Sequence, residues 1–217
     1  MRVTKIERQR HHPQRVNLYL DGEFALGLHA DVLVKAGIRL GDRLDTSTIA
    51  LLRTHEEATL ARNAALRLLM HRMRTEKELR LSLIEKEFDP SVVDNVIHEL
   101  QMRGIVDDRK FAEAFIHDAR LRRPAGKIML YHKLRQHGVG RDLIRETLDE
   151  NLPVDKEQEL AYATAMSVLK RFRSSRKAVP PDLEQRKVAQ YLLRRGFTAG
   201  TIAPVIRKIF SSKQERG

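Results

Sequence analysis

One pattern of apolar residues occurs three times in this chain of 217 residues, and it limits the possible folds more than any other feature. The copies align on Phe88, Val139 and Phe197, which are 51 and 58 residues apart. Nine, five and four positions before these anchors stand Leu79, Leu83, Ile84, then Leu130, Leu134, Arg135, then Val188, Leu192, Leu193. Five and nine positions after them stand Val93 and Ile97, Ile144 and Leu148, and Ile202 and Ile206. Because these spacings return to one helical face, they predict amphipathic helices in small repeated units that must stack to complete a core.

The N-terminal residues 1–53 predict a different structure, a small α+β module. Residues 15–20 and 23–28 alternate around Asp21-Gly22, which is typical of a hairpin with a type I′ turn, and residues 3–8 could add a third strand. A short helix over residues 30–36 and another from Thr46 to about Arg53 follow. Because a module of this size is too small to be stable alone, we expect it to dock on the first repeat.

From Glu56 onward the pattern is helical, and proline, glycine and capping residues divide it. We expect helical repeats at 54–105, 106–153 and 154–210, and a flexible tail at 211–217. The predicted helices cover 56–73, 76–87 and 91–102, then 109–122, 126–136 and 141–150, then 155–172, 182–195 and 199–210. Thr75 is expected to cap a helix, and Gly138 and Gly196 to end helices in a left-handed conformation. The predicted fold is therefore mainly α, with three tandem three-helix repeats after the N-terminal hairpin module.

The charge of the chain is positive and unevenly distributed. Lys and Arg number 41 against 29 Asp and Glu, a formal net charge of +12, of which residues 154–217 hold +8. A basic surface favours a polyanionic partner or an acidic protein surface, although surplus cations also simply keep a protein soluble. The last repeat is therefore the better candidate for an anion-facing surface.

Several classes of protein are excluded or disfavoured. The absence of cysteine removes disulfides and cysteine-based metal sites. No apolar run of about 18 residues could span a bilayer, and the charged N-terminus lacks the apolar segment of a signal peptide, so we expect a cytoplasmic protein without membrane contact.

No motif predicts catalysis, a metal site or a cofactor. The pair Asp107-Asp108 has no histidine or further acid at ligand spacing, so a helix-capping role is favoured. The nine histidines form no i, i+4 pair of the zinc-binding kind. Gly126-Lys127 resembles the end of a phosphate loop, but Leu121 stands where the first glycine of that loop belongs. We therefore expect no enzyme activity and no cofactor.

Two basic clusters are candidates for contact with a partner. The first surrounds Pro124 and comprises Arg120, Arg122, Arg123 and Lys127. The second lies in the last repeat and comprises Lys170, Arg171, Arg173, Arg176, Lys177, Arg194, Arg195, Arg207 and Lys208. Arginine suits carboxylates and phosphates alike, yet cations near helix C-termini can be purely structural. The few aromatic residues fall at helical core positions, so no platform for stacking bases is expected.

Four short motifs follow one another along the helical part of the chain. They are Arg74-Thr75-Glu76-Lys77-Glu78-Leu79, the stretch Gly104–Ala112 (GIVDDRKFA), the series Arg120, Gly126, Leu130, Leu134 and Gly138, and Tyr191–Phe197 (YLLRRGF). In these motifs and their order, residues 54–210 resemble the RecX family, bacterial regulators of the RecA recombinase, and the hairpin module resembles the extension of longer members. Thr75 replaces the commoner serine, and Lys133 stands where many members carry an acid.

This resemblance implies an elongated, curved stack of three-helix units that lies in the groove of the RecA filament on single-stranded DNA. Bound there, family members generally dampen ATP hydrolysis and strand exchange, or limit filament extension. A monomer is expected, and direct contact with single- or double-stranded DNA stays open. The alternative is a general basic helical-repeat protein that binds nucleic acid, because the charge of the last repeat suits phosphates.

Overall fold

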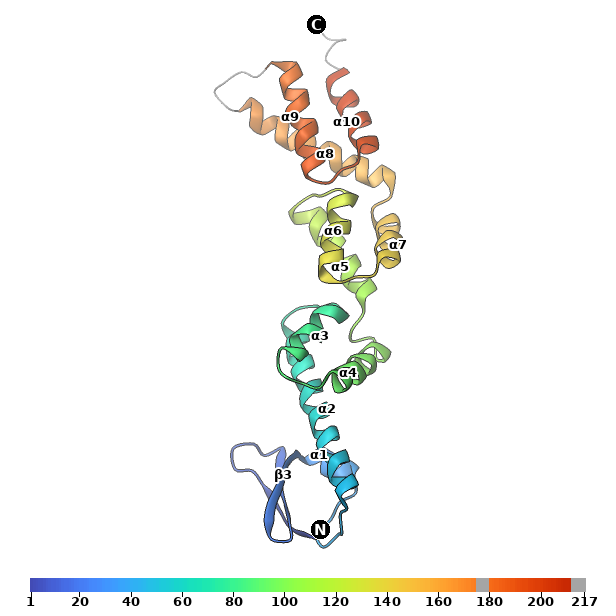
Figure 1. Cartoon of the computed structure of the whole chain (residues 1–217). Coiled ribbons are helices and arrows are strands. Elements are labelled where there is room, and N and C mark those ends of the chain that lie inside the picture. Colours follow the sequence, from blue (N-terminus) through green and yellow to red (C-terminus); the bar gives the residue numbers. More distant parts are fainter. Residues whose placement is uncertain (175–179, 212–217) are drawn as a thin grey trace. The chain divides into compact units, whose positions relative to one another are not determined.

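The structure is a computed structural model that describes residues 1–174 and 180–211. It divides into two compact units, residues 1–106 and residues 107–217, which are described separately (Figure 1). The expected fold class is confirmed. The first unit holds a small antiparallel sheet and the first helical repeat, and the described part of the second unit is helical.

The sheet is built from three strands that the sequence predicts, β1 (Val3–Arg8), β2 (Arg15–Leu20) and β3 (Glu23–His29), in the order β1-β2-β3. Asp21 and Gly22 join β2 to β3, and their φ angles of 49° and 91° give the expected turn with two left-handed residues. One face of β2 is buried, because side chains alternate along a strand. The short helix α1 (Ala30–Lys35) closes this module.

Helix α2 (Thr46–His71) differs from the prediction of two separate helices. It runs unbroken through the proposed limit near Arg53, since no glycine or proline interrupts the chain there. Leu52 belongs to the core of the N-terminal module, whereas Ala61 and Ala65 belong to the core of the first repeat. A single helix thus serves both cores. The expected limit near Arg53 therefore marks only a change of packing partner along one continuous helix.

Glu56 on α2 ties the N-terminal module to this helix. Its carboxylate accepts a hydrogen bond from the backbone N–H of His29 at 2.5 Å and forms an ion pair with Arg15 at 2.8 Å. Glu56 is buried, so removal of either partner would leave a poorly compensated charge inside the protein. The module therefore packs on the first helix of the first repeat, as expected.

Within the described residues each repeat contains three helices, and apart from the start of α2 their bounds agree with the predicted ones to within a few residues. The first repeat adds α3 (Glu76–Ile84) and α4 (Pro90–Met102) to the end of α2. The second consists of α5 (Asp108–Arg122), α6 (Lys127–His137) and α7 (Arg141–Asn151), and the third of α8 (Val154–Arg173), α9 (Pro181–Arg194) and α10 (Ala199–Ser211). Each repeat has its own hydrophobic core.

The predicted core positions are buried in all three repeats, with one exception. The residues nine and five before each anchor, and five and nine after it, all lie in the core. The residue four before the anchor does not: Ile84 is 39% exposed and Leu193 is 62% exposed. Ile84 is the last residue of α3 and Leu193 is the last but one of α9, so no following turn of the helix covers these side chains.

The predicted helix caps are present. The Thr75 side chain accepts a hydrogen bond from the N–H of Glu78, and the Asp107 carboxylate accepts bonds from the N–H groups of Arg109 and Lys110 at 3.0 Å. The bond from Lys110 lowers the pKa of Asp107 below its ordinary value. The pair Asp107-Asp108 is therefore a helix start, as the sequence predicts.

Candidate functional site

The second and third repeats meet through a close backbone contact between two glycines. The N–H of Gly126 donates to the carbonyl of Arg195 at 2.9 Å, and the N–H of Ile128 donates to the carbonyl of Gly196 at 3.1 Å. A Cβ atom on Gly126 would lie 2.3 Å from the Gly196 oxygen, and one on Gly196 would lie 2.4 Å from the Met129 nitrogen. Both positions thus require glycine, and the start of α6 is held directly against the turn between α9 and α10.

A buried carboxylate completes this junction. Glu157 on α8 is 2% exposed, and it accepts hydrogen bonds from the N–H of Lys127 at 2.8 Å and from the hydroxyl of Thr201 at 2.9 Å. Lys127 begins α6 and Thr201 lies in the first turn of α10. One carboxylate therefore lies at the N-terminal ends of two helices, where the peptide dipoles favour negative charge.

Arg195 adds a third link between the two repeats. Its Nε donates to the carbonyl of Pro124 at 2.8 Å, and its Nη2 donates to the carbonyl of Arg123 at 2.7 Å and also to that of Pro124. Among the described residues it has no acidic partner. Arg195, a candidate contact residue, thus fixes the turn at Pro124 while its positive charge stays unneutralised.

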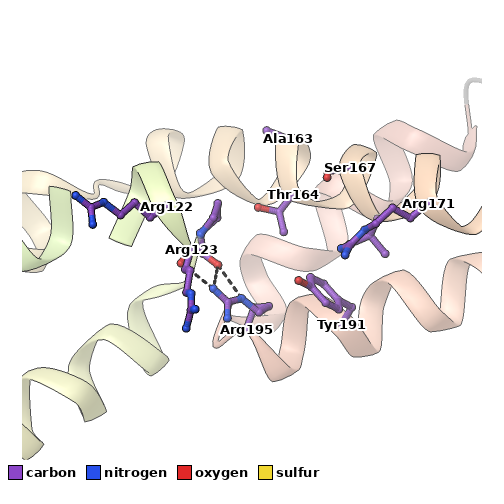
Figure 2. Close-up of a pocket in the computed structure, with 10 residues that line it drawn as sticks. Arg122, Arg123, Ala163, Thr164, Ser167, Arg171, Tyr191 and Arg195 are labelled. Atoms are coloured by element: carbon purple, nitrogen blue, oxygen red, sulfur yellow. Dashed lines mark hydrogen bonds between the residues drawn. The ribbon is translucent and has the colours of Figure 1, made fainter. Parts of the chain in front are cut away.

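A groove beside this junction brings together members of both basic clusters (Figure 2). Arg122, Arg123 and Pro124 line it from the second repeat, and Arg171 on α8 and Arg195 line it from the third. Its volume is about 450 Å³. The remaining lining residues are Ala163, Thr164, Ser167, Val168 and Tyr191, so no acidic side chain among the described residues lines the groove. We call it the arginine groove.

Four other candidates are engaged within the protein. The Nη1 of Arg120 donates to the carbonyl of Asn151 at 3.4 Å, and Arg122 forms an ion pair with Asp118 at 2.8 Å. Lys127 pairs with Asp149 at 2.6 Å and Arg173 with Glu184 at 2.9 Å. The hydrogen bond with Glu184 raises the pKa of the Arg173 guanidinium. These cations are less available to a partner than their number in the sequence suggests.

The other described candidates, apart from Arg195, are exposed, and two of them also lie near an aromatic ring. Within the described ranges, Arg123, Lys170, Arg194 and Arg207 are exposed and make no ion pair. The Arg171 guanidinium lies 5.9 Å from the centre of the Tyr191 ring, and Lys208 lies 4.9 Å from that of Tyr162. Lys170, Arg194, Arg207 and Lys208 do not line the arginine groove. Arg176 and Lys177 lie outside the described residues.

Three polar residues of the groove were not candidates from the sequence: Thr164, Ser167 and Tyr191. Tyr191 belongs to the YLLRRGF motif, which could have marked it as a candidate. Its contact with Arg171, however, depends on how α8 packs against α9. Among the residues the structure describes, no three His, Asp or Glu side chains are placed to hold a metal ion. Likewise, no described helix is long and apolar enough to cross a membrane.

Comparison with known families covers nearly the whole chain. The family model of the regulatory protein RecX N-terminal domain matches residues 1–45. The models of the first, second and third RecX three-helix domains match residues 61–100, 107–148 and 156–206. The four matches follow the order in which the hairpin module and the three repeats occur.

Similar proteins and structures carry the same description. The regulatory protein RecX of Clostridium acetobutylicum is 31% identical over 212 residues, 96% of each chain. That of Bacillus subtilis is 32% identical over 207 residues, 95% of this chain and 76% of the relative. A crystal structure of regulatory protein RecX is 26% identical, with a TM-score of 0.77 over 97% of this chain and 98% of the other. RecX from Lactobacillus salivarius, 20% identical with a TM-score of 0.64 over 71% of this chain, shares the fold.

Proposed function

Because this chain belongs to the RecX family of regulatory proteins, we propose that it regulates a RecA recombinase, mainly as an inhibitor. It acts as a cytoplasmic monomer without catalytic activity of its own, and binds the recombinase filament on single-stranded DNA. The observation that carries this proposal is the pair Arg123 and Arg171, two arginines of the arginine groove that have no acidic partner among the described residues. Such cations suit the acids of a filament groove or the phosphates of the bound strand.

Inhibition requires that the regulator binds one state of the filament more tightly than another. ATP hydrolysis and strand exchange need the recombinase subunits to change conformation, and a ligand shifts such an equilibrium only through its differential affinity. A stiff contact surface on the regulator supports this mechanism. An easily deformed surface would follow the conformational change of the recombinase subunits and would bind both states alike. The junction of the second and third repeats, with its two glycines and buried Glu157, supplies such stiffness.

The proposal is tested by titrating the full chain into a RecA ATPase assay on single-stranded DNA. We expect the hydrolysis rate to fall with added protein, and the double variant Arg123→Glu, Arg171→Glu to need about tenfold more protein for the same effect. The matched control is Arg39→Glu, Arg53→Glu, which reverses two exposed arginines of the first unit. Unchanged hydrolysis, filament length and strand exchange with the wild-type chain would contradict the proposal.

The second candidate function is general nucleic-acid binding. It is favoured by the charge of the last repeat and by the arginine groove, whose described lining residues include no acid. Salt dependence distinguishes the two functions. A general binder holds naked DNA with an affinity that falls steeply with salt, and gains nothing when a recombinase filament covers the strand. A filament regulator binds the coated strand more tightly than the bare one at the same salt concentration.

A further inference from the structure

The arginine groove is lined by positive charges, and no acidic side chain of the described residues lines it with them. Arg123 and Arg171 enter it from different repeats, and neither forms an ion pair with a described residue. Arg122 is the exception, because its guanidinium is paired with Asp118, which does not line the groove. Cations that line one groove raise the positive potential within it, so an anion that enters the groove is stabilised there.

Arg195 gives the groove a donor that is already in place. Its Nε and Nη2 atoms are held by the carbonyls of Arg123 and Pro124, whereas no hydrogen bond within the described residues uses Nη1. Carbonyl groups orient the guanidinium but do not cancel its charge. Because the side chain is half-buried and fixed, binding an anion at Nη1 costs little further rotamer entropy.

Hydroxyl groups supply further donors around the same space. In Figure 2 the Tyr191 hydroxyl points towards the space between Arg195 and Arg171. It makes no hydrogen bond within the described residues, and the same holds for the hydroxyl of Ser167. The Tyr191 ring also lies against the Arg171 guanidinium, which limits the freedom of that side chain.

The number of donors favours phosphate over carboxylate. A carboxylate and a phosphodiester each offer two charged oxygens, but phosphodiesters recur along a strand, and a free phosphate offers four oxygens and up to two charges, so both suit several cations at once. We propose that the arginine groove is a phosphate-binding site, with Arg195 as its fixed donor and Arg123 and Arg171 as the two arms that close on the ligand. The phosphate is that of a nucleic-acid strand or a free phosphate, and the experiment separates the two.

The position of the groove gives phosphate binding a structural consequence. Arg123 belongs to the second repeat, Arg171 and Arg195 belong to the third, and Arg195 already joins the two. A phosphate held by all three crosses the junction that Gly126 and Gly196 form. Occupation of the site therefore stabilises that junction, since a ligand that binds only the folded state raises its stability. This inference is independent of recombinase regulation, because it needs no recombinase, and it names the groove that would supply the phosphate contact in the second candidate function.

The first measurement is the affinity of the full chain for a fluorescent oligothymidylate, by anisotropy at several salt concentrations. The groove variant is Arg123→Gln, Arg171→Gln, and the matched control is Arg194→Gln, Arg207→Gln, which removes two exposed, unpaired arginines outside the groove. We expect the groove variant to bind about tenfold or more weakly, and the slope of log K against log salt to fall in magnitude by about 0.7 for each phosphate of the single strand that the variant no longer neutralises. Equal losses in both variants would overturn the site, because they would show that only net charge matters.

The second measurement is the thermal unfolding midpoint with three added probes, the oligonucleotide, inorganic phosphate and polyglutamate. Phosphate-dependent stabilisation of the wild-type chain and of the control variant, but not of the groove variant, supports the proposal. If the oligonucleotide raises the midpoint at a much lower concentration of phosphate groups than inorganic phosphate does, the site binds a strand. If inorganic phosphate raises it equally at the same concentration of phosphate groups, the site binds a free phosphate. Polyglutamate that protects better than either would overturn the preference for phosphate. Circular dichroism of each variant confirms that its helices are intact.

Discussion

At the scale of single residues, the position before each of the anchors Phe88, Val139 and Phe197 has the same left-handed backbone conformation, although its side chain differs between repeats. Glu87, Gly138 and Gly196 have φ angles of 65°, 97° and 79°. In each repeat the N–H of the anchor that follows donates to the carbonyl five residues earlier, which closes the helix in the same way. The left-handed conformation is strained for glutamate and not for glycine. The first repeat thus keeps the turn at some cost in stability.

The residue Glu87 therefore offers a stabilising substitution. We expect Glu87→Gly to raise the free energy of unfolding by about 0.5–1 kcal/mol, because relief of left-handed strain exceeds the added entropy of the unfolded chain. Gly138→Ala is the matched opposite, with a loss of about 1 kcal/mol. Urea unfolding followed by circular dichroism measures both. If Glu87→Gly also lowered the free energy of unfolding, the Glu87 side chain would contribute more to stability than its left-handed strain costs.

At the scale of elements, the start of a helix at a repeat junction depends on an acid from another helix. We expect Glu157→Ala to lower the free energy of unfolding by about 2–4 kcal/mol, since Lys127 and Thr201 would lose a buried acceptor. Glu157→Gln keeps one carbonyl oxygen and should lose about half as much. The exposed Glu159 on the same helix is the control, because Glu159→Ala removes a charge without an ion pair among the described residues. Thermal unfolding that is unchanged in Glu157→Ala would refute the role of this carboxylate.

The helix starts also predict how stability depends on pH. Hydrogen bonds from the hydroxyl and N–H of Thr48 lower the pKa of Asp45 from 3.8 to about 2, and bonds from Ser91 lower that of Asp89. The folded chain therefore holds fewer protons than the unfolded chain in this range, so these caps stabilise fully above a pH of about 4 and lose their effect as the pH falls towards about 2. We expect the thermal midpoint to drop over this window, and to drop less in Asp89→Asn. If the thermal midpoint of Asp89→Asn fell with pH as much as that of the wild-type chain, groups other than Asp89 would cause the loss of stability in acid.

The elements also show where reading the sequence succeeds and where it stops. The helices of the repeats were predictable because their core residues recur at helical spacing and their ends carry Thr75, Asp107 or a glycine. The break near Arg53 was wrong because the apolar face of α2 changes partner there without a change in the backbone. Of the candidate site, the sequence indicated the two clusters, but it did not show that Arg173 is neutralised by Glu184 while Arg123 stays unpaired. Ion pairing depends on which side chains are neighbours in space.

At the scale of the whole molecule, the resemblance to the RecX family predicts an elongated monomer. Small-angle X-ray scattering of the full chain checks this, because a compact protein of this length would have a radius of gyration of about 17 Å. We expect a clearly larger radius, together with the mass of one chain in light scattering. A radius near the compact value would contradict the extended stack. A doubled mass would contradict the monomer.

The sequence by itself determined the number of repeats, their three-helix design, the hairpin module and the family, because helical periodicity, turn residues and caps act between residues close together in the chain. Only the tertiary structure decided which positively charged side chains line the same groove. Arg195 is 71 and 72 residues away from the carbonyls of Pro124 and Arg123 that it binds. Gly126 fits against the backbone of Gly196 and Phe197 only because it has no Cβ atom of its own. The arginine groove forms where two repeats pack together, so its donors are set by contacts between distant segments, which no local pattern records.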